Sequence, residues 1–241
     1  MTRILVTGTS SGIGEYTAKY LLAQKAEVIG VARRDAPALA GHAGYTHLRG
    51  DLSDPATVAE IARVAGQGPL DGVVFNAGIL ESVTQVANTK LADFRKVFDV
   101  NLFAVVDLTQ ALVPLLRATK GRAIYVSSGA ATNAYTGWAA YGSSKAALNL
   151  VAATLAKEEP ELTVVSVAPG VVDTGMQDLI RGTHVGTGEM GADAQKFLEL
   201  KQSGKLVDPR DSGDLYGSLA LRAPHSLSGK FFRYDDPVLQ V

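Results

Sequence analysis

Short apolar runs alternate with longer amphipathic stretches along this chain. The first run, Ile4-Leu5-Val6, ends at a glycine-rich loop, after which Tyr16, Tyr20 and Leu21 recur at the spacing of one helix face. A second apolar run at 28–32 follows at once. A strand, a helix and a strand within about 30 residues form a βαβ unit, which requires a parallel sheet.

The same alternation continues toward the C-terminal end. Further strands are expected at 45–48, 72–75, 122–126, 162–167 and 230–234, and further helices at 54–64, 91–116, 143–157 and 208–220. Pro114 lies inside the long helix and predicts a kink or an early end there. The order predicts an α/β fold with one doubly wound (Rossmann), mainly parallel seven-stranded sheet and helices on both faces, as a single domain over residues 1–241.

Regular patterning fades in one segment, residues 175–204. Five glycines fall between Gly175 and Gly191, and no apolar period persists. We expect a mobile segment of short helices at this point. Segments of this kind often cover binding sites, so this one is expected to cover the substrate.

Composition narrows the possible functions. Hydrophobic residues make up 46% and charged residues 20%, which argues against disorder or a membrane protein. The formal net charge of -1, without a basic run, argues against a nucleic-acid partner. The chain has no cysteine, which excludes disulfides and thiolate chemistry, and its histidines lack metal-ligand spacing, so no metal is expected. Too few apolar residues precede Gly8 for a signal peptide or a membrane span, so a cytoplasmic protein with a small-molecule partner is expected.

The loop Thr7-Gly8-Thr9-Ser10-Ser11-Gly12-Ile13-Gly14 joins the first strand to the first helix. Glycines allow a tight turn and let backbone N–H groups approach a phosphate, and the helix N-terminus adds favourable partial charge. The G-x-G-x-x-G spacing is not met, so the position of the loop is the stronger indication. Nucleotide binding is favoured over a simple turn.

Two arginines follow the second strand at the point that decides between nicotinamide dinucleotides. About 20 residues after such a loop, an acidic side chain holds the ribose 2′-OH of NAD, or a basic one accepts the 2′-phosphate of NADP. This chain has Arg33 and Arg34 there, and its first nearby acidic residue, Asp35, comes only afterwards. The pattern predicts NADP, and the alternative is that both arginines are solvated loop charges.

Tyr141 and Lys145 form a candidate acid–base pair. Residues four apart are neighbours on a helix face. A phenol has a pKa of about 10, and a nearby ammonium group favours the phenolate, which moves the tyrosine toward acid–base work at neutral pH. The alternative is an ordinary Tyr and Lys on a helix surface, and the rest of the chain decides between the two.

These features together resemble the short-chain dehydrogenase/reductase family, and within it most closely the benzil reductase and sepiapterin reductase group. The likeness covers essentially the whole chain. It rests on the glycine loop at 7–14, Asp51-Leu52, Asn76-Ala77-Gly78, Asn101, Ser128 at 13 positions before Tyr141, Lys145, and the segment from Pro169 to Thr174.

The resemblance implies a catalytic set. Tyr141 would protonate the substrate carbonyl oxygen as the nicotinamide delivers hydride to carbon, and Ser128 would hydrogen-bond the same oxygen. Lys145 would lower the Tyr141 pKa and hold the nicotinamide ribose, and Asn101 would support a water relay. Two donors suit the growing charge on the oxygen, and an amide suits ordered water.

The resemblance also implies which residues meet the cofactor. Asp51 and Leu52 would meet the adenine, and Val172 and Thr174 the carboxamide. The full implied set is Gly8, Ser10, Ser11, Gly12, Ile13, Gly14, Arg33, Arg34, Asp51, Leu52, Asn76, Ala77, Gly78, Tyr141, Lys145, Pro169, Gly170, Val172 and Thr174.

The substrate side of the site is less defined by the sequence. Met176, Leu179 and Ile180, just after Thr174, are expected to form an apolar wall, together with Ser128 as a hydrogen-bonding group. Trp138 either lines this pocket or packs the helix entrance. Two departures from the family pattern bear on the substrate class: Phe75 precedes the Asn-Ala-Gly triplet, and Tyr234-Asp235-Asp236 replaces an Asp-Gly-Gly ending.

The resemblance therefore predicts an NADPH-dependent carbonyl reductase acting on a small, largely apolar ketone or a benzil-like diketone. The alternatives are an NAD(P)-dependent alcohol or hydroxysteroid dehydrogenase acting oxidatively and a non-catalytic dinucleotide sensor. A homodimer or homotetramer is expected, packed through the helices that follow Leu91 and Tyr141.

Overall fold

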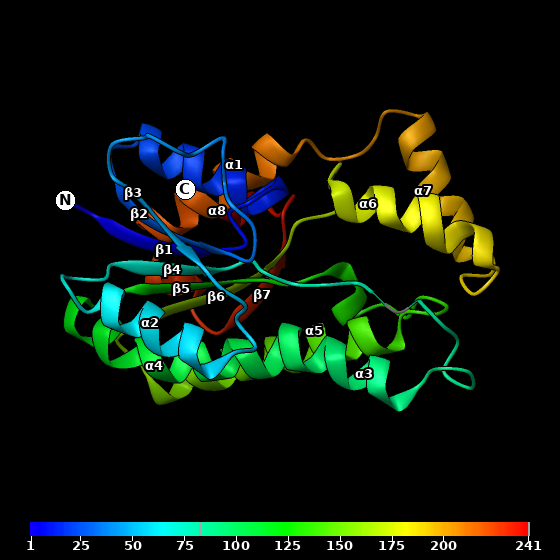
Figure 1. The fold of residues 1–241 in the computed structure, drawn as a ribbon, viewed down its shortest axis with the longest axis horizontal. Helices are drawn as coiled ribbons and strands as arrows, with labels where there is room; N and C mark the ends of the chain where they lie inside the picture. Colours follow the sequence, from blue (N-terminus) through cyan, green and yellow to red (C-terminus); the bar gives the residue numbers. More distant parts are fainter. Residues whose placement is uncertain (82, 241) are drawn as a thin grey trace.

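The computed structural model describes residues 1–81 and 83–240 and contains one sheet of seven strands in the order β3-β2-β1-β4-β5-β6-β7 (Figure 1). The strands are β1 Arg3–Thr7, β2 Glu27–Ala32, β3 Tyr45–Arg49, β4 Gly72–Phe75, β5 Arg122–Val126, β6 Thr163–Ala168 and β7 Lys230–Arg233. All neighbouring strands pair in parallel. The predicted doubly wound sheet is confirmed.

Helices cover both faces of the sheet, and each face has its own core. Helices α1 (Gly12–Ala23) and α8 (Pro209–Arg222) cover one face, while α2 (Pro55–Ala65), α4 (Ala104–Thr119) and α5 (Ala139–Glu158) cover the other (Figure 1). The pleat of β1 sends Ile4 and Val6 into the first core and Leu5 into the second. Because the central strands are buried on both faces, they appear in the sequence as continuous apolar runs.

The sheet order reverses between β1 and β4. From β1 the chain builds outward to β3, then returns to β4 and builds in the other direction to β7. In open α/β sheets, ligands bind beyond the carboxyl ends of the strands at this switch point. The glycine loop leaves β1 at this end, so the fold places it where a ligand is expected.

The expected long helix differs from its prediction. It is divided into α3 (Leu91–Phe98), a π-helical turn at Asp99–Phe103, and α4, which continues past Pro114 to Thr119. An early end at Pro114 is therefore wrong. The ring removes one backbone hydrogen bond, but the buried side chains of Leu108, Leu112 and Leu116 hold α4 against the sheet through that point. Regularity changes instead around Asn101, and π-helical turns often occur at functional sites.

The region from α3 to α4 is also apolar. By length and composition, the helical stretch Leu91–Thr119 could cross a membrane, and 44% of its most apolar window is buried inside the protein. Its inward-facing residues belong to the second core, beneath the sheet. The stretch is thus accounted for as a core helix of this fold.

Short helices fill the irregular segment, as expected. They are α6 (Gly175–Leu179), a π-helical turn at Ile180–His184, a 3₁₀ turn at Val185–Thr187, and α7 (Asp193–Gln202). The two ends of the segment meet, because Val172 pairs with Val207 and the Asp173 carboxylate binds Lys201 at 2.8 Å and Arg181 at 3.5 Å. The segment projects beyond the end of the sheet (Figure 1). Its mobility stays a prediction.

Candidate active site

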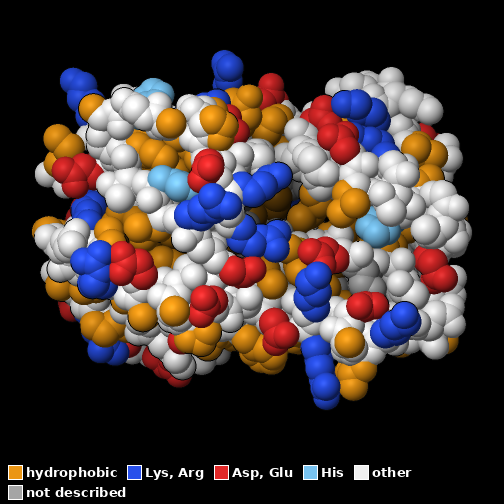
Figure 2. Space-filling model, in the orientation of Figure 1, with side chains coloured by type: hydrophobic (Ala, Val, Ile, Leu, Met, Phe, Trp, Pro, Cys, Tyr) orange, Lys and Arg blue, Asp and Glu red, His pale blue; other side chains and the backbone are white. Residues whose placement is uncertain are grey.

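A cavity of about 900 Å³ lies beyond the carboxyl ends of the central strands, between them and the α6–α7 segment. Figure 2 shows the molecule hollowed here, with lysine and arginine side chains beside the opening. All candidate residues from the sequence line this cavity except Gly14 and Asn101, both of which lie in the described part of the chain. Residues spread from position 8 to position 180 are thus brought to one site.

The glycine loop is tightly fitted to its surroundings. Gly8 and Gly12 have φ values of +79° and +59°, a region that favours glycine. A Cβ atom at Gly14 would lie 2.3 Å from the Gly8 carbonyl oxygen and 2.5 Å from Nδ2 of Asn76. Asn76 in turn donates to the Thr7 carbonyl oxygen at 2.8 Å, so the loop after β4 braces the loop after β1. Gly14 therefore acts by close packing, not by lining the cavity.

The start of α1 is suited to a phosphate. Ser11 is its N-cap residue, yet no side chain in the described part of the chain caps this helix end. The first N–H groups of a helix have no partner within the helix, and together with the helix dipole they attract an anion. A loop whose glycines leave room for a ligand, followed by N–H groups without partners in the helix, fits the pyrophosphate of a dinucleotide.

The two arginines lie at the edge of this loop. Arg34 donates through Nη2 to the Ser11 hydroxyl at 3.2 Å, and Nη1 of Arg33 lies 3.9 Å from the Asp51 carboxylate. Asp51 also accepts hydrogen bonds from the backbone and hydroxyl of Ser53, and the backbone bond contributes most to lowering the pKa of Asp51. Asp35 pairs with a different residue, Arg49, at 3.7 Å. Positive charge therefore faces the loop at the end of β2.

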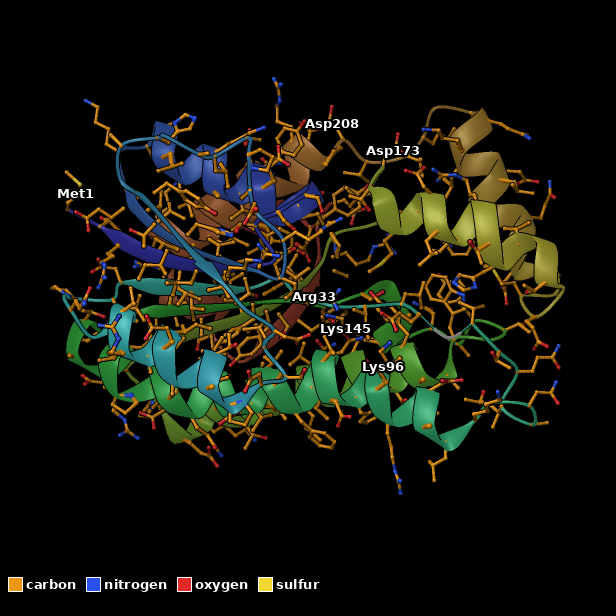
Figure 3. The ribbon with its side chains drawn as sticks, viewed as in Figure 1. Met1, Arg33, Lys96, Lys145, Asp173 and Asp208 are labelled. Carbon is orange, nitrogen blue, oxygen red and sulfur yellow. The ribbon has the colours of Figure 1, made fainter. Side chains whose placement is uncertain are left out.

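Tyr141 and Lys145 lie one turn apart in α5, and both are buried, with 7% and 3% of their surfaces exposed. Lys145 Nζ donates to the Val126 carbonyl oxygen at 2.8 Å, at the end of β5. Figure 3 shows Lys145 and Arg33 on the same side of the molecule, where the strands end. The candidate acid and its neighbouring cation are thus inside the cavity wall and not on a helix surface.

Burial controls the protonation of this pair. Burial raises the pKa of Tyr141, while hydrogen bonding to Ser128 lowers it in part. Burial also lowers the pKa of Lys145 to about 8. A phenol with a raised pKa keeps its proton at neutral pH and can donate it. The expected lowering of the Tyr141 pKa by Lys145 stays a prediction.

Asn101 holds a neighbouring loop from within the π-helical turn. Its Oδ1 accepts from the Ile79 N–H at 2.8 Å, and its Nδ2 donates to the Ile79 carbonyl oxygen at 2.9 Å and to the Ser144 hydroxyl at 3.3 Å. Its side chain is completely buried. Asn101 therefore joins the turn to α5 behind the cavity, and its role in a water relay stays a prediction.

An aromatic wall closes the substrate side. Trp138 meets Tyr141 edge to face, with ring centroids 5.6 Å apart, and stacks on Phe197 of α7 at 5.2 Å. Ile180 is fully buried in the same cluster, Met176 packs against it, and Leu179 also lines the cavity. Trp138 thus both lines the pocket and packs the helix entrance.

Sequence reasoning missed several lining residues in this wall, among them Tyr135, Gln177 and Phe197. Phe197 is the one aromatic residue in α7, and that position is a weak signal of an inward contact. Tyr135 lies in a loop, and Gln177 follows no strand directly. Only the folded segment shows where these side chains point.

The two departures from the family pattern have different consequences. Phe75 stacks on Tyr125 in the core, with centroids 4.6 Å apart, and does not line the cavity. Tyr234 lines the cavity and packs on Gly170, where a Cβ atom would lie 2.5 Å from the Tyr234 ring. The second departure therefore shapes the site directly. Among the described residues, no three His, Asp or Glu side chains gather as a metal-binding group.

The comparisons with known proteins agree with this geometry. The sequence model described as short chain dehydrogenase matches residues 2–184, and the chain belongs to this family. An oxidoreductase of Schizosaccharomyces pombe is 40% identical, with 96% of this chain and 95% of that protein covered. A benzil reductase ((S)-benzoin forming) of Saccharomyces cerevisiae is 37% identical, with 97% and 95% covered.

Solved structures show the same fold. A short chain dehydrogenase/reductase from Saccharomyces cerevisiae superposes with a TM-score of 0.94 at 37% identity, covering 100% of this chain and 98% of that one. Another structure from that yeast, described as a cytoplasmic protein, has a TM-score of 0.81 at 35% identity and covers 99% and 98%. An NADP active-site complex from Pseudomonas aeruginosa has a TM-score of 0.81 at 29% identity and covers 99% and 96%.

Proposed function

We propose that this oxidoreductase is an NADPH-dependent carbonyl reductase for a small, largely apolar ketone or a benzil-like diketone. The observation that carries the proposal is the buried Tyr141, in hydrogen-bonding contact with Ser128 and one helical turn from Lys145 in the cavity wall. The aromatic wall next to Tyr141 suits an aryl substituent. The similarity to a yeast benzil reductase supports the same substrate class.

The chain supplies two hydrogen-bond donors to the substrate oxygen. When bound, the reduced nicotinamide ring supplies the hydride that adds to the carbonyl carbon. The Tyr141 hydroxyl donates to the carbonyl oxygen and gives up its proton as negative charge develops there, and the Ser128 hydroxyl donates to the same oxygen. Lys145, one helical turn from Tyr141, supplies a positive charge that favours the tyrosinate left behind. Burial of Tyr141 and Lys145 limits the access of water to the proton donor.

Arg33 and Arg34 support NADP as the cofactor. Guanidinium groups bind phosphate oxygens with strong, charge-assisted hydrogen bonds. Arg34 lies against the loop hydroxyl groups and Arg33 is more than half exposed, so both are available to a 2′-phosphate at the end of β2. The NADP complex of the Pseudomonas relative supports the assignment by similarity. Cofactor preference distinguishes this proposal from the alternative, an NAD-dependent dehydrogenase.

The proposal is tested by initial rates with NADPH and NADH against a panel of aryl ketones, benzil-like diketones, pterins and steroids. We expect kcat/KM with NADPH to exceed that with NADH by roughly 10- to 100-fold, because one or two charged hydrogen bonds distinguish them. Arg33→Ala with Arg34→Ala should remove this preference, and Arg63→Ala, at an exposed arginine paired with Glu60, should not. A preference for NADH, or turnover of steroid alcohols alone, would favour the oxidative alternative. NADPH binding without any turnover would favour a sensor.

We also propose that the protein is a cytoplasmic homodimer or homotetramer. Phe103 beside α4 and Leu150 on α5 are 57% and 70% exposed, unusually high for large apolar side chains on long helices. Light scattering is expected to give a mass above that of one chain, and Leu150→Glu is expected to lower it. A monomer mass for the unaltered protein at all concentrations would contradict the assembly. The cytoplasmic yeast relative supports the location.

A further inference from the structure

We propose that Gln177 binds a second oxygen of the substrate, which makes the pocket selective for carbonyl compounds with another oxygen next to the reduced group, such as vicinal diketones. The inference rests on the proposed function for its reaction but identifies a separate contact. Gln177 lies in α6, is only 7% exposed, and lines the cavity.

The orientation of the Gln177 amide is fixed by Arg181. Nη1 of Arg181 donates to Oε1 of Gln177 at 3.4 Å, while Nη2 binds the carboxylates of Asp178 at 2.8 Å and Asp173 at 3.5 Å. The guanidinium has donors only, so the amide oxygen must face it and the NH₂ group must face away. The Arg181 side chain is itself only 11% exposed, so this arrangement is held within the segment.

The NH₂ group of Gln177 is left with hydrogen-bonding capacity. Within residues 1–81 and 83–240, no protein oxygen accepts from its Nε2. Gln177 Nε2 is not among the buried side-chain atoms that lack a partner, so this donor is accessible from the cavity that the residue lines. An acceptor that enters the cavity would therefore gain this bond.

The face of α6 that carries Gln177 is turned toward the catalytic residues. Ile180, three residues further on, shares that helix face and is completely buried in one cluster with Trp138 and Tyr141. A substrate whose carbonyl oxygen meets Tyr141 extends its remaining atoms between this face and the aromatic wall. An apolar substituent there leaves the amide unpaired, whereas a second oxygen satisfies it.

Two charged side chains near the substrate side already have partners. Lys196 donates from Nζ to the Tyr135 hydroxyl at 2.7 Å and lies over the ring of that residue. Glu81, which also lines the cavity, forms an ion pair with Lys96. Nε1 of Trp138 has no partner among the described residues either, but that atom is buried and has almost no accessible surface. Gln177 is thus the candidate donor for a second substrate oxygen.

In the proposed reaction only one of the two carbonyl groups is reduced. The carbonyl at Tyr141 gains a hydride at carbon and the phenolic proton at oxygen, which gives a hydroxyl group. The second carbonyl group accepts a hydrogen bond from Gln177 and remains a carbonyl group in the product. The product is an α-hydroxyketone.

The kinetic test compares benzil with deoxybenzoin, in which a methylene group replaces one carbonyl. Gln177→Leu is expected to lower kcat/KM for benzil about tenfold and that for deoxybenzoin by less than about threefold, as expected for loss of one buried hydrogen bond. Benzil is intrinsically more reactive, so the comparison uses variant-to-unaltered ratios for each substrate, in which reactivity cancels. Gln195→Leu, at an exposed glutamine of α7, is the matched control and should change neither ratio.

A second variant separates the hydrogen bond from general damage to the segment. Gln177→Glu keeps the side-chain length and the contact with Arg181 but replaces the NH₂ donor by an acceptor. It should show the same selective loss for benzil, with an unchanged melting temperature. Equal losses for both substrates in both variants, or no loss in either, would overturn the role of Gln177.

Equilibrium binding distinguishes failure of this inference from failure of the proposed function. Trp138 is the only tryptophan, so its fluorescence reports directly on the pocket of the NADP⁺ complex. The unaltered protein should bind benzil more tightly than deoxybenzoin, and Gln177→Glu should weaken the binding of benzil about tenfold. This result supports the inference even if the protein catalyses the reduction of neither compound. Equal affinities for the unaltered protein and the variant refute it even if both compounds are reduced.

Discussion

Tyr141→Phe is expected to lower kcat about a thousandfold while the dissociation constant for NADPH changes less than about threefold. Phenylalanine keeps the edge-to-face contact with Trp138, in which the ring centroids are 5.6 Å apart, so the cavity wall is preserved. Only the hydroxyl that contacts Ser128 and carries the transferable proton is lost. Turnover and cofactor binding are measured separately, by single-turnover absorbance and by NADPH fluorescence.

A matched control is available on the surface. Tyr20 accepts a hydrogen bond from Arg222 at its hydroxyl and lies on α1, and Tyr20→Phe should leave kcat within about twofold of the unaltered enzyme. If Tyr141→Phe also retained kcat within about tenfold, Tyr141 would not be the acid. A loss of NADPH binding instead would indicate that the tyrosine serves the cofactor and not the proton transfer.

Lys145→Met is expected to abolish most activity and yet stabilise the cofactor-free protein. Burial lowers the pKa of Lys145 from 10.5 to about 8, so between these values the unfolded chain binds a proton that the native state lacks. Stability of the unaltered protein therefore rises with pH from about 8 to 10.5, and the full cost of the buried ammonium remains below pH 8. Methionine removes that cost but also the hydrogen bond to Val126. The net gain expected at pH 7 is about 2 kcal/mol in the free energy of unfolding.

The measurement is urea unfolding of both proteins at neutral pH and near pH 10. The difference between them should shrink as the pH rises, because Lys145 is then neutral in the native state. Lys157→Met, at an exposed position of the same helix, is the control and should show no such gain. Lower stability of Lys145→Met at pH 7 would show that the bond to Val126 outweighs the cost of burial.

Much of the fold follows from local pattern, because the central strands are buried on both faces and therefore appear as uninterrupted apolar runs. The glycine loop and the pair of Tyr141 and Lys145 could also be predicted from the sequence, because each depends on short spacings within one part of the chain. The structure brings these residues around one cavity, while their individual roles stay predictions. The match to the short chain dehydrogenase family confirms the resemblance on which those roles depend.

The remaining features depend on contacts between distant parts of the chain. Pro114 suggested a helix end because its ring removes a local bond, but buried leucines on either side of it hold α4 in place. No pattern in the nearby sequence predicts the π-helical turn at Asn101. The turn occurs together with hydrogen bonds from Asn101 to Ile79, which lies 22 positions earlier in the chain. The orientation of Gln177 depends on Arg181 and Asp173, and that of Phe197 on Trp138.

The pairing of Val172 with Val207, reinforced by Asp173, has a consequence for engineering and for evolution. Because Val172 pairs with Val207, the α6–α7 segment leaves and re-enters the body at adjacent points. Changing the length of a closed loop costs little extra entropy. The segment can therefore be exchanged as a cassette that alters substrate scope, while the sheet, the dinucleotide loop and the proton donor are inherited unchanged.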